Sequence, residues 1–89
     1  MPKAEISWKR SIEGGTKMEV NARRAGGRWI FYTRERRYEQ WHAMDNPPLE
    51  DWLELLDGVR RRIARRLFRP EEELRVKKSI SELFPGTVF

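Results

Sequence analysis

The stretch that decides the fold is EISWKRSIEGGTKMEVNARRAGGRWIFYTR, residues 5–34, in which two glycine pairs separate three blocks of alternating or apolar residues. In the first block, Ile6, Trp8 and Ile12 share one face of an extended chain and polar residues occupy the other, which is typical of a half-buried strand. The glycine pairs provide the positive φ angles that tight hairpin turns need. The pattern predicts an antiparallel meander with strands near residues 5–12, 17–24 and 28–35.

The third strand differs from the first two because the consecutive apolar residues Trp29 to Tyr32 occupy both of its faces, as in a central strand. Four charged residues occupy positions 34–37, and the aromatic residues Tyr38 and Trp41 follow them. A single strand over residues 28–44 would exceed the usual strand length. Either the third strand continues or the chain turns back, and we favour a short fourth strand near residues 38–43.

After Asn46 the apolar residues recur every three or four positions, which is the period of a helix. The apolar positions are Leu49, Trp52, Leu53, Leu56, Val59, Ile63 and Leu67. We predict a helix over residues 47–68, capped by Asn46 and stopped before Pro70, which disfavours helical geometry in the residue that precedes it.

A second helix is predicted over residues 70–84, because Pro70 and three glutamates suit a first helical turn and Pro85 and Gly86 suit a terminus. The expected fold class is α+β. It consists of an antiparallel meander of three or four N-terminal strands followed by two C-terminal helices packed on one face of the sheet. We expect a single domain over residues 1–89, since a chain of this length rarely holds a second one.

The composition restricts the chemistry that the chain could support. The 89 residues include no cysteine and one histidine, His42, so thiol nucleophiles and thiolate or multi-histidine metal sites are not expected. We interpret His42 as structural and expect no enzyme activity, metal or cofactor. No apolar run approaches the roughly 20 residues that span a bilayer, and residues 1–10 lack the apolar centre of a signal peptide, so we expect a cytoplasmic protein without a membrane partner.

Positive charge is concentrated in two segments. The formal net charge is +5. Six arginines lie in each of two segments, Arg23 to Arg37 and Arg60 to Arg69; the first segment also contains one glutamate, and the second contains no acidic residue. Such asymmetry favours an anionic partner. The helical arginines also have a structural interpretation, because they face away from the apolar stripe, complement the helix dipole and can pair with nearby acids.

The segment Arg23 to Arg37 is the better functional candidate because basic residues alternate there with aromatic ones. Basic side chains for phosphates and exposed rings for unpaired bases are the parts that a single-strand-binding sheet uses. The candidate residues are Arg23, Arg24, Arg28, Trp29, Phe31, Arg34, Arg36 and Arg37 on the sheet, with Arg61, Arg62 and Arg65 as a second group on the helix. If helices cover one face of the sheet, only one of the pairs Trp29/Phe31 and Ile30/Tyr32 is left for a partner.

We therefore predict a small non-enzymatic nucleic-acid-binding protein that holds single-stranded DNA or RNA on an arginine and aromatic sheet surface. The alternative is a protein interaction module or homodimer whose arginines are only solvated. Salt-dependent binding to nucleic acid would distinguish the two.

An arginine-rich meander followed by NPPLEDWLELLDGVRRRI, residues 46–63, loosely resembles the single-strand-binding domains of transcriptional coactivators related to positive cofactor four. The resemblance covers roughly residues 5–66 and includes a tryptophan in the helix, Trp52. It implies a curved sheet, a dimerising helix and single-strand binding. The second predicted helix, residues 70–84, departs from that family's pattern, and the resemblance assigns no role to any residue.

Overall fold

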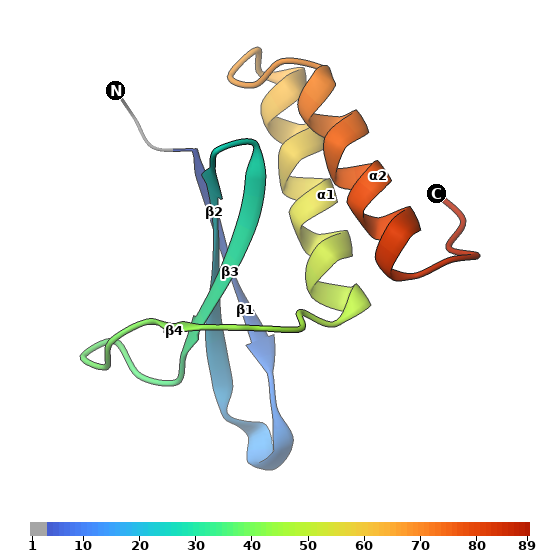
Figure 1. Cartoon of the computed structure of the whole chain (residues 1–89). Helices are drawn as coiled ribbons and strands as arrows, with labels where there is room; N and C mark the ends of the chain where they lie inside the picture. The colour runs from blue at the N-terminus through green and yellow to red at the C-terminus, as the bar shows by residue number, and fades with distance from the viewer. Residues whose placement is uncertain (1–3) are drawn as a thin grey trace. The chain divides into compact units, whose positions relative to one another are not determined.

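The computed structural model describes residues 4–89, and the chain forms two compact units, Met1–Pro47 and Pro48–Phe89 (Figure 1). The first unit contains an antiparallel sheet of four strands, and the second contains two helices. The predicted α+β order, with N-terminal strands and C-terminal helices, is confirmed.

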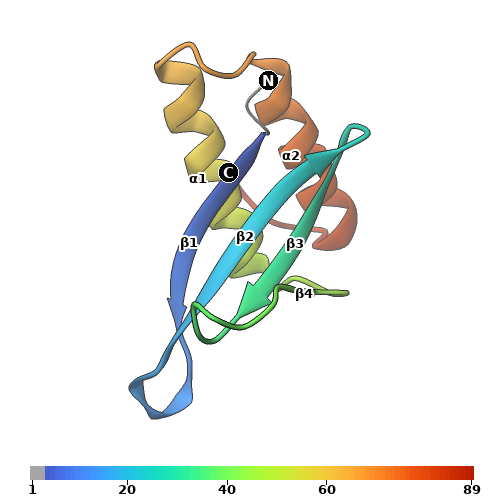
Figure 2. The ribbon, with the colours of Figure 1, turned by 90° about the vertical axis from the view of Figure 1, so that its left-hand side faces the viewer.

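The sheet is a simple meander in the order β1-β2-β3-β4 (Figure 2). Its strands are β1 (Glu5–Ser11), β2 (Lys17–Ala25), β3 (Arg28–Arg34) and β4 (His42–Ala43). The glycine pairs form both long hairpins. Gly14 and Gly15, inside a short 3-10 turn (Glu13–Gly15), have φ of 83° and 77°, and Gly26 and Gly27 have φ of 59° and 80°. A residue with a Cβ is strained at such angles, which is why the glycines predicted the boundaries of the first three strands to within one residue.

The two faces of this sheet differ in chemistry. One face carries the buried side chains Ile6, Val20, Ala22 and Phe31, and the Trp8 ring meets Phe31 edge-on at 6.0 Å. We call the other face the polar face. In register order across the sheet it contains Glu5, Arg23 and Ile30, then Ser7, Asn21 and Tyr32, then Lys9, Glu19 and Arg34.

The predicted fourth strand over residues 38–43 is wrong in length, because β4 has two residues and pairs His42 with Thr33 and Ala43 with Tyr32. Residues 35–41 instead form an irregular connection with a turn at Arg37 and Tyr38, where the Glu39 amide donates to the Arg36 carbonyl at 3.0 Å. The aromatic residues Tyr38 and Trp41, which indicated a strand, belong to this connection. Tyr38 is 79% exposed, so its ring makes few buried contacts that could stabilise a longer strand.

The first helix, α1 (Leu49–Ala64), is shorter than the predicted 47–68. Its N-cap is Pro48 rather than Asn46, and no side chain caps it. At its other end, Arg66 adopts a left-handed φ of 60°, so that the Leu67 amide reaches the Arg62 carbonyl at 2.8 Å and the Arg66 amide reaches the Ile63 carbonyl at 2.9 Å. These are the two hydrogen bonds of a Schellman motif, which ends the helix before Pro70 can act.

The buried stripe of α1 is displaced from the predicted one. Leu55, which the predicted stripe omitted, is fully buried, whereas Leu53 and Leu67 are 40% and 67% exposed. Trp52, Leu56 and Val59 are buried as predicted. The second helix, α2 (Glu71–Leu83), agrees with the prediction to within one residue at each end, and Val76 and Ile80 are buried.

Candidate nucleic-acid interface

A chain of hydrogen bonds crosses the centre of the polar face. Asn21, 3% exposed, donates from Nδ2 to the Ser7 hydroxyl at 2.6 Å and accepts at Oδ1 from the Nε of Arg23 at 2.7 Å. The Arg23 guanidinium lies 4.8 Å from the centre of the Tyr32 ring, and its Nε is 3.5 Å from a Glu5 carboxylate oxygen. Because the buried amide uses both of its ends, it fixes the position of the arginine above the tyrosine.

A second group lies beside it, at the end of the sheet where β4 begins. The Nε of Arg34 donates to Oε2 of Glu19 at 2.5 Å, and the Arg34 guanidinium lies 4.2 Å from the centre of the Trp41 ring. The hydrogen bond from Arg34 holds the pKa of the Glu19 carboxyl below its ordinary value, and the nearby positive charges of Arg34 and Lys9 act in the same direction. The Glu19 side chain is therefore ionised at neutral pH.

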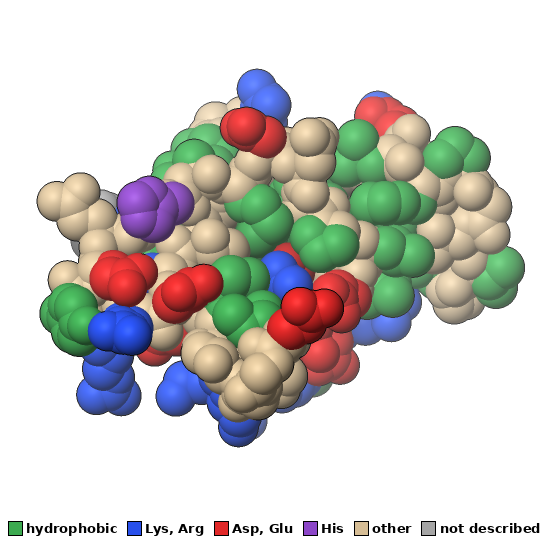
Figure 3. Space-filling view, turned by 90° about the horizontal axis from the view of Figure 1, so that it is seen from below, with side chains coloured by type: hydrophobic (Ala, Val, Ile, Leu, Met, Phe, Trp, Pro, Cys, Tyr) green, Lys and Arg blue, Asp and Glu red, His purple; other side chains and the backbone are tan. Residues whose placement is uncertain are grey.

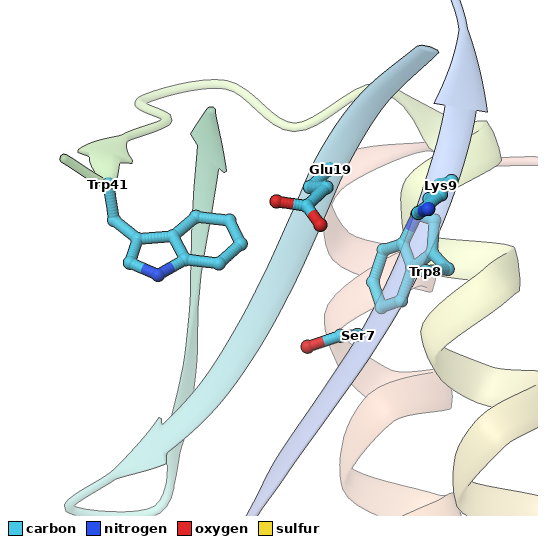
Figure 4. A pocket seen from close by; sticks show the side chains of 5 residues that line it. All are labelled: Ser7, Trp8, Lys9, Glu19 and Trp41. Atoms are coloured by element: carbon cyan, nitrogen blue, oxygen red, sulfur yellow. The ribbon is translucent and has the colours of Figure 1, made fainter. Parts of the chain in front are cut away.

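A shallow pocket of about 280 Å³ opens next to this group (Figure 4). Its lining residues are Ser7, Trp8 and Lys9 from β1, Glu19 from β2, and Trp41. In Figure 4 the Trp41 ring and the Glu19 carboxylate point towards each other, and the Ser7 side chain points to the same side. The pocket therefore combines an aromatic wall, a carboxylate and a cation, Lys9, which has no ion-pair partner within residues 4–89.

The predicted sheet residues are divided between the two faces. Arg23, Arg28 and Arg34 lie on the polar face, whereas Arg24 and Trp29 are paired with each other in the register on the opposite face. Phe31, on that opposite face, is 1% exposed, so its ring is not accessible to a base. The rings that accompany arginines are Tyr32 and Trp41 instead. Arg36 and Arg37 follow β3, and Arg36 donates to the Tyr38 hydroxyl at 2.7 Å.

The helical arginines have local partners. Arg61 lies 3.3 Å from the Asp57 carboxylate one turn earlier, and Arg62 donates to the Gly58 carbonyl at 3.2 Å. Arg65 is the C-cap residue that follows α1, and it is exposed. Arg60, which was not among the candidates, donates to Glu73 of α2 at 2.9 Å. These contacts agree with the structural interpretation of the helical arginines.

None of the five residues that line the pocket was among the candidates predicted from the sequence. Lys9 and Glu19 are register partners, so the alternation of the hairpin already contained that signal. Trp41 is brought to Arg34 by the pairing of β3 with β4, and its position depends on the length of the irregular connection.

Residues 4–89 contain no group of three or more His, Asp or Glu side chains that could hold a metal ion. Within the same residues, neither helix has the length and apolar character needed to cross a membrane. His42 is exposed on β4.

Comparison with protein-family models gives no match for the chain. Comparisons with curated proteins and with solved structures also give no significant match. The resemblance to the coactivator domains therefore gains no support from these comparisons.

Proposed function

We propose that the protein binds single-stranded nucleic acid on the polar face of its sheet. The observation that carries this proposal is the presence of two aromatic rings, Tyr32 and Trp41, on one face, each in contact with a guanidinium group. Rings of this kind stack on unpaired bases of any sequence, and arginine planes extend the stacking surface. Paired bases of a duplex would not be available to them.

The charge of the polar face favours an anionic strand. Five cations, Lys9, Lys17, Arg23, Arg28 and Arg34, share it with two acids, Glu5 and Glu19. Both acids lie against arginines, so Arg23 and Arg34 are partly neutralised within the sheet. Lys9, Lys17 and Arg28 have no ion-pair partner within residues 4–89 and supply the phosphate contacts.

The test is a titration of fluorescently labelled oligothymidine with the intact protein at two salt concentrations. Three phosphate contacts on a single strand predict a log-log slope of the binding constant against salt of about −2. A duplex of the same length is the control and should bind more weakly, because its bases are stacked on each other. No measurable binding to DNA or RNA single strands at low salt would overturn the proposal, and equal affinity for the duplex would contradict the stacking role of Tyr32 and Trp41.

A protein interaction module or homodimer is the second candidate, and exposed apolar side chains of the helical unit favour it. Leu74, Leu83 and Val88 are 66%, 57% and 92% exposed. Figure 3 also shows hydrophobic side chains at the surface between charged ones of both signs. A dimer that forms with rising concentration in analytical sedimentation, together with no oligonucleotide binding, would favour this function over the first.

A further inference from the structure

The pocket beside Trp41 holds a carboxylate that a non-specific single-strand surface does not need. Phosphates repel a carboxylate, and stacking on aromatic rings requires only the π-face of a base. Glu19 nevertheless lines the pocket, and its side chain is 20% exposed. We propose that this pocket selects guanine, with the Glu19 carboxylate accepting hydrogen bonds from the base. The inference rests on the proposed single-strand binding and adds a base preference to it.

The hydrogen bonds of Glu19 leave part of its accepting capacity for a ligand. Oε2 accepts from Arg34, and Oε1 accepts from no residue within positions 4–89. An ionised carboxylate has about four lone-pair sites, so three remain after the Arg34 bond. The bond from Arg34 also fixes the orientation of the carboxylate, which lowers the entropy that binding would otherwise cost.

Only guanine presents two adjacent donors, N1–H and the N2 amino group, on its Watson–Crick edge. A carboxylate accepts both in parallel, as it does with a guanidinium. Cytosine and adenine each offer one amino donor next to a ring nitrogen that is itself an acceptor, and thymine or uracil offers one N–H between two carbonyls. Each of those bases would place a lone pair against the negative charge of Glu19, so the pocket discriminates by repulsion as well as by attraction.

The remaining walls suit a single planar base. The volume of about 280 Å³ lies just below the range of pockets that hold larger ligands. Trp41 provides the flat apolar wall on one side, and the Ser7 and Lys9 side chains lie on β1 at the other side of Glu19 (Figure 4). The Lys9 ammonium remains available to a phosphate of the same strand.

The experiment uses nonamers of thymidine in which the central nucleotide is replaced by one carrying guanine, hypoxanthine, 2-aminopurine, adenine or cytosine. Hypoxanthine keeps N1–H and lacks the amino group, whereas 2-aminopurine keeps the amino group and lacks N1–H. We expect guanine to bind tightest and the two analogues to bind about tenfold more weakly, since each retains one donor. Thymine, adenine and cytosine should bind no better than the analogues.

The variant Glu19→Gln should remove the preference for guanine and leave binding to oligothymidine in place. The matched control is Glu13→Gln, because Glu13 is an exposed glutamate in the turn between β1 and β2 and should retain the preference. Equal affinity for all central bases would overturn guanine selection while leaving single-strand binding intact. A preference that persists in a folded Glu19→Gln protein would overturn the role of Glu19. Absence of binding to every oligonucleotide would instead overturn the proposed function.

Discussion

Two segments of this chain, Arg23 to Arg37 and Arg60 to Arg69, have six arginines each and differ in what the arginines contact. In the sheet, Arg23 and Arg34 lie against aromatic rings and form ion pairs with carboxylates of neighbouring strands, Glu5 and Glu19 respectively. In the helical unit, Arg61 and Arg62 contact groups one turn earlier on their own helix. Similar composition therefore produces a laterally connected surface in one unit and, apart from the bond from Arg60 to Glu73 of α2, local pairing in the other.

The physical cause of this difference is the period of each element. A strand places alternate residues on one face and neighbouring strands about 5 Å apart, so an arginine on β2 or β3 meets side chains distant in sequence. A helix places residues four apart next to each other, so its arginines meet their own neighbours first. An interaction surface is therefore more readily assembled from the sheet than from the helical unit.

The largest expected difference concerns the apolar residues inside the two segments. Phe31→Ala should destabilise the protein by about 3–5 kcal/mol, because it removes a fully buried ring and leaves a cavity. Leu67→Ala in the other segment should change the free energy of unfolding by less than about 0.5 kcal/mol, because that side chain is 67% exposed. Urea unfolding followed by circular dichroism measures both. Equal losses would show that the burial of the two residues does not determine their contributions.

The second difference concerns ligand binding. Trp41→Ala should weaken binding to oligothymidine by about 1–3 kcal/mol, the usual contribution of one stacked base. Arg65→Ala, which removes an exposed cation at the end of α1, should leave the affinity nearly unchanged. The measurement is fluorescence anisotropy at fixed low salt. A larger loss for Arg65→Ala than for Trp41→Ala would transfer the binding surface from the sheet to the helical segment.

The sequence predicted the first three strands well because each boundary carries a local signal. The glycines at 14–15 and 26–27 require positive φ, and the alternation of Ile6 and Trp8 fixes which residues share a face. The choice between Trp29/Phe31 and Ile30/Tyr32 could not be made from the strand alone. Both pairs alternate equally well, and the neighbouring strands decide which pair lies beside the arginines.

The helix boundaries and the pocket depended on contacts that periodicity does not contain. The buried face of α1 includes Asp51 and Gly58, and neither residue is identified by a pattern of large apolar side chains. The position of Trp41 depends on turns at residues 35–41, where no regular pattern exists. The end of α1 was predicted too late because a left-handed arginine occupies the position where glycine is the usual signal.

The left-handed arginine is Arg66, and replacing it should change the stability of the helical unit. Arg66→Gly should stabilise the helical unit by about 1 kcal/mol, because glycine adopts a left-handed φ without the steric cost that a Cβ imposes. Arg24→Gly is the contrasting change in the sheet, where the extended backbone favours a side chain and the substitution should destabilise. Thermal unfolding of both variants measures the signs. Destabilisation by Arg66→Gly would mean that the arginine side chain contributes more than the backbone strain costs.

The smallest expected effect is a pH dependence that each unit shows separately. Hydrogen bonds from Arg34 to Glu19, and from Arg60 and Lys77 to Glu73, hold both carboxyl pKa values below the ordinary 4.5. Each carboxyl group binds its proton more weakly in the folded state than in the unfolded state. The ion pairs therefore stabilise the protein fully above pH 4.5, and this stabilisation is lost as the pH falls through the lowered pKa values of the folded state. Glu19→Gln and Glu73→Gln should each reduce the difference in unfolding free energy between pH 7 and pH 3. Both effects should shrink in high salt, since all five side chains of these ion pairs are partly exposed. An unchanged pH dependence in Glu19→Gln would mean that Arg34 gains no stabilisation from the carboxylate and is held by Trp41 alone.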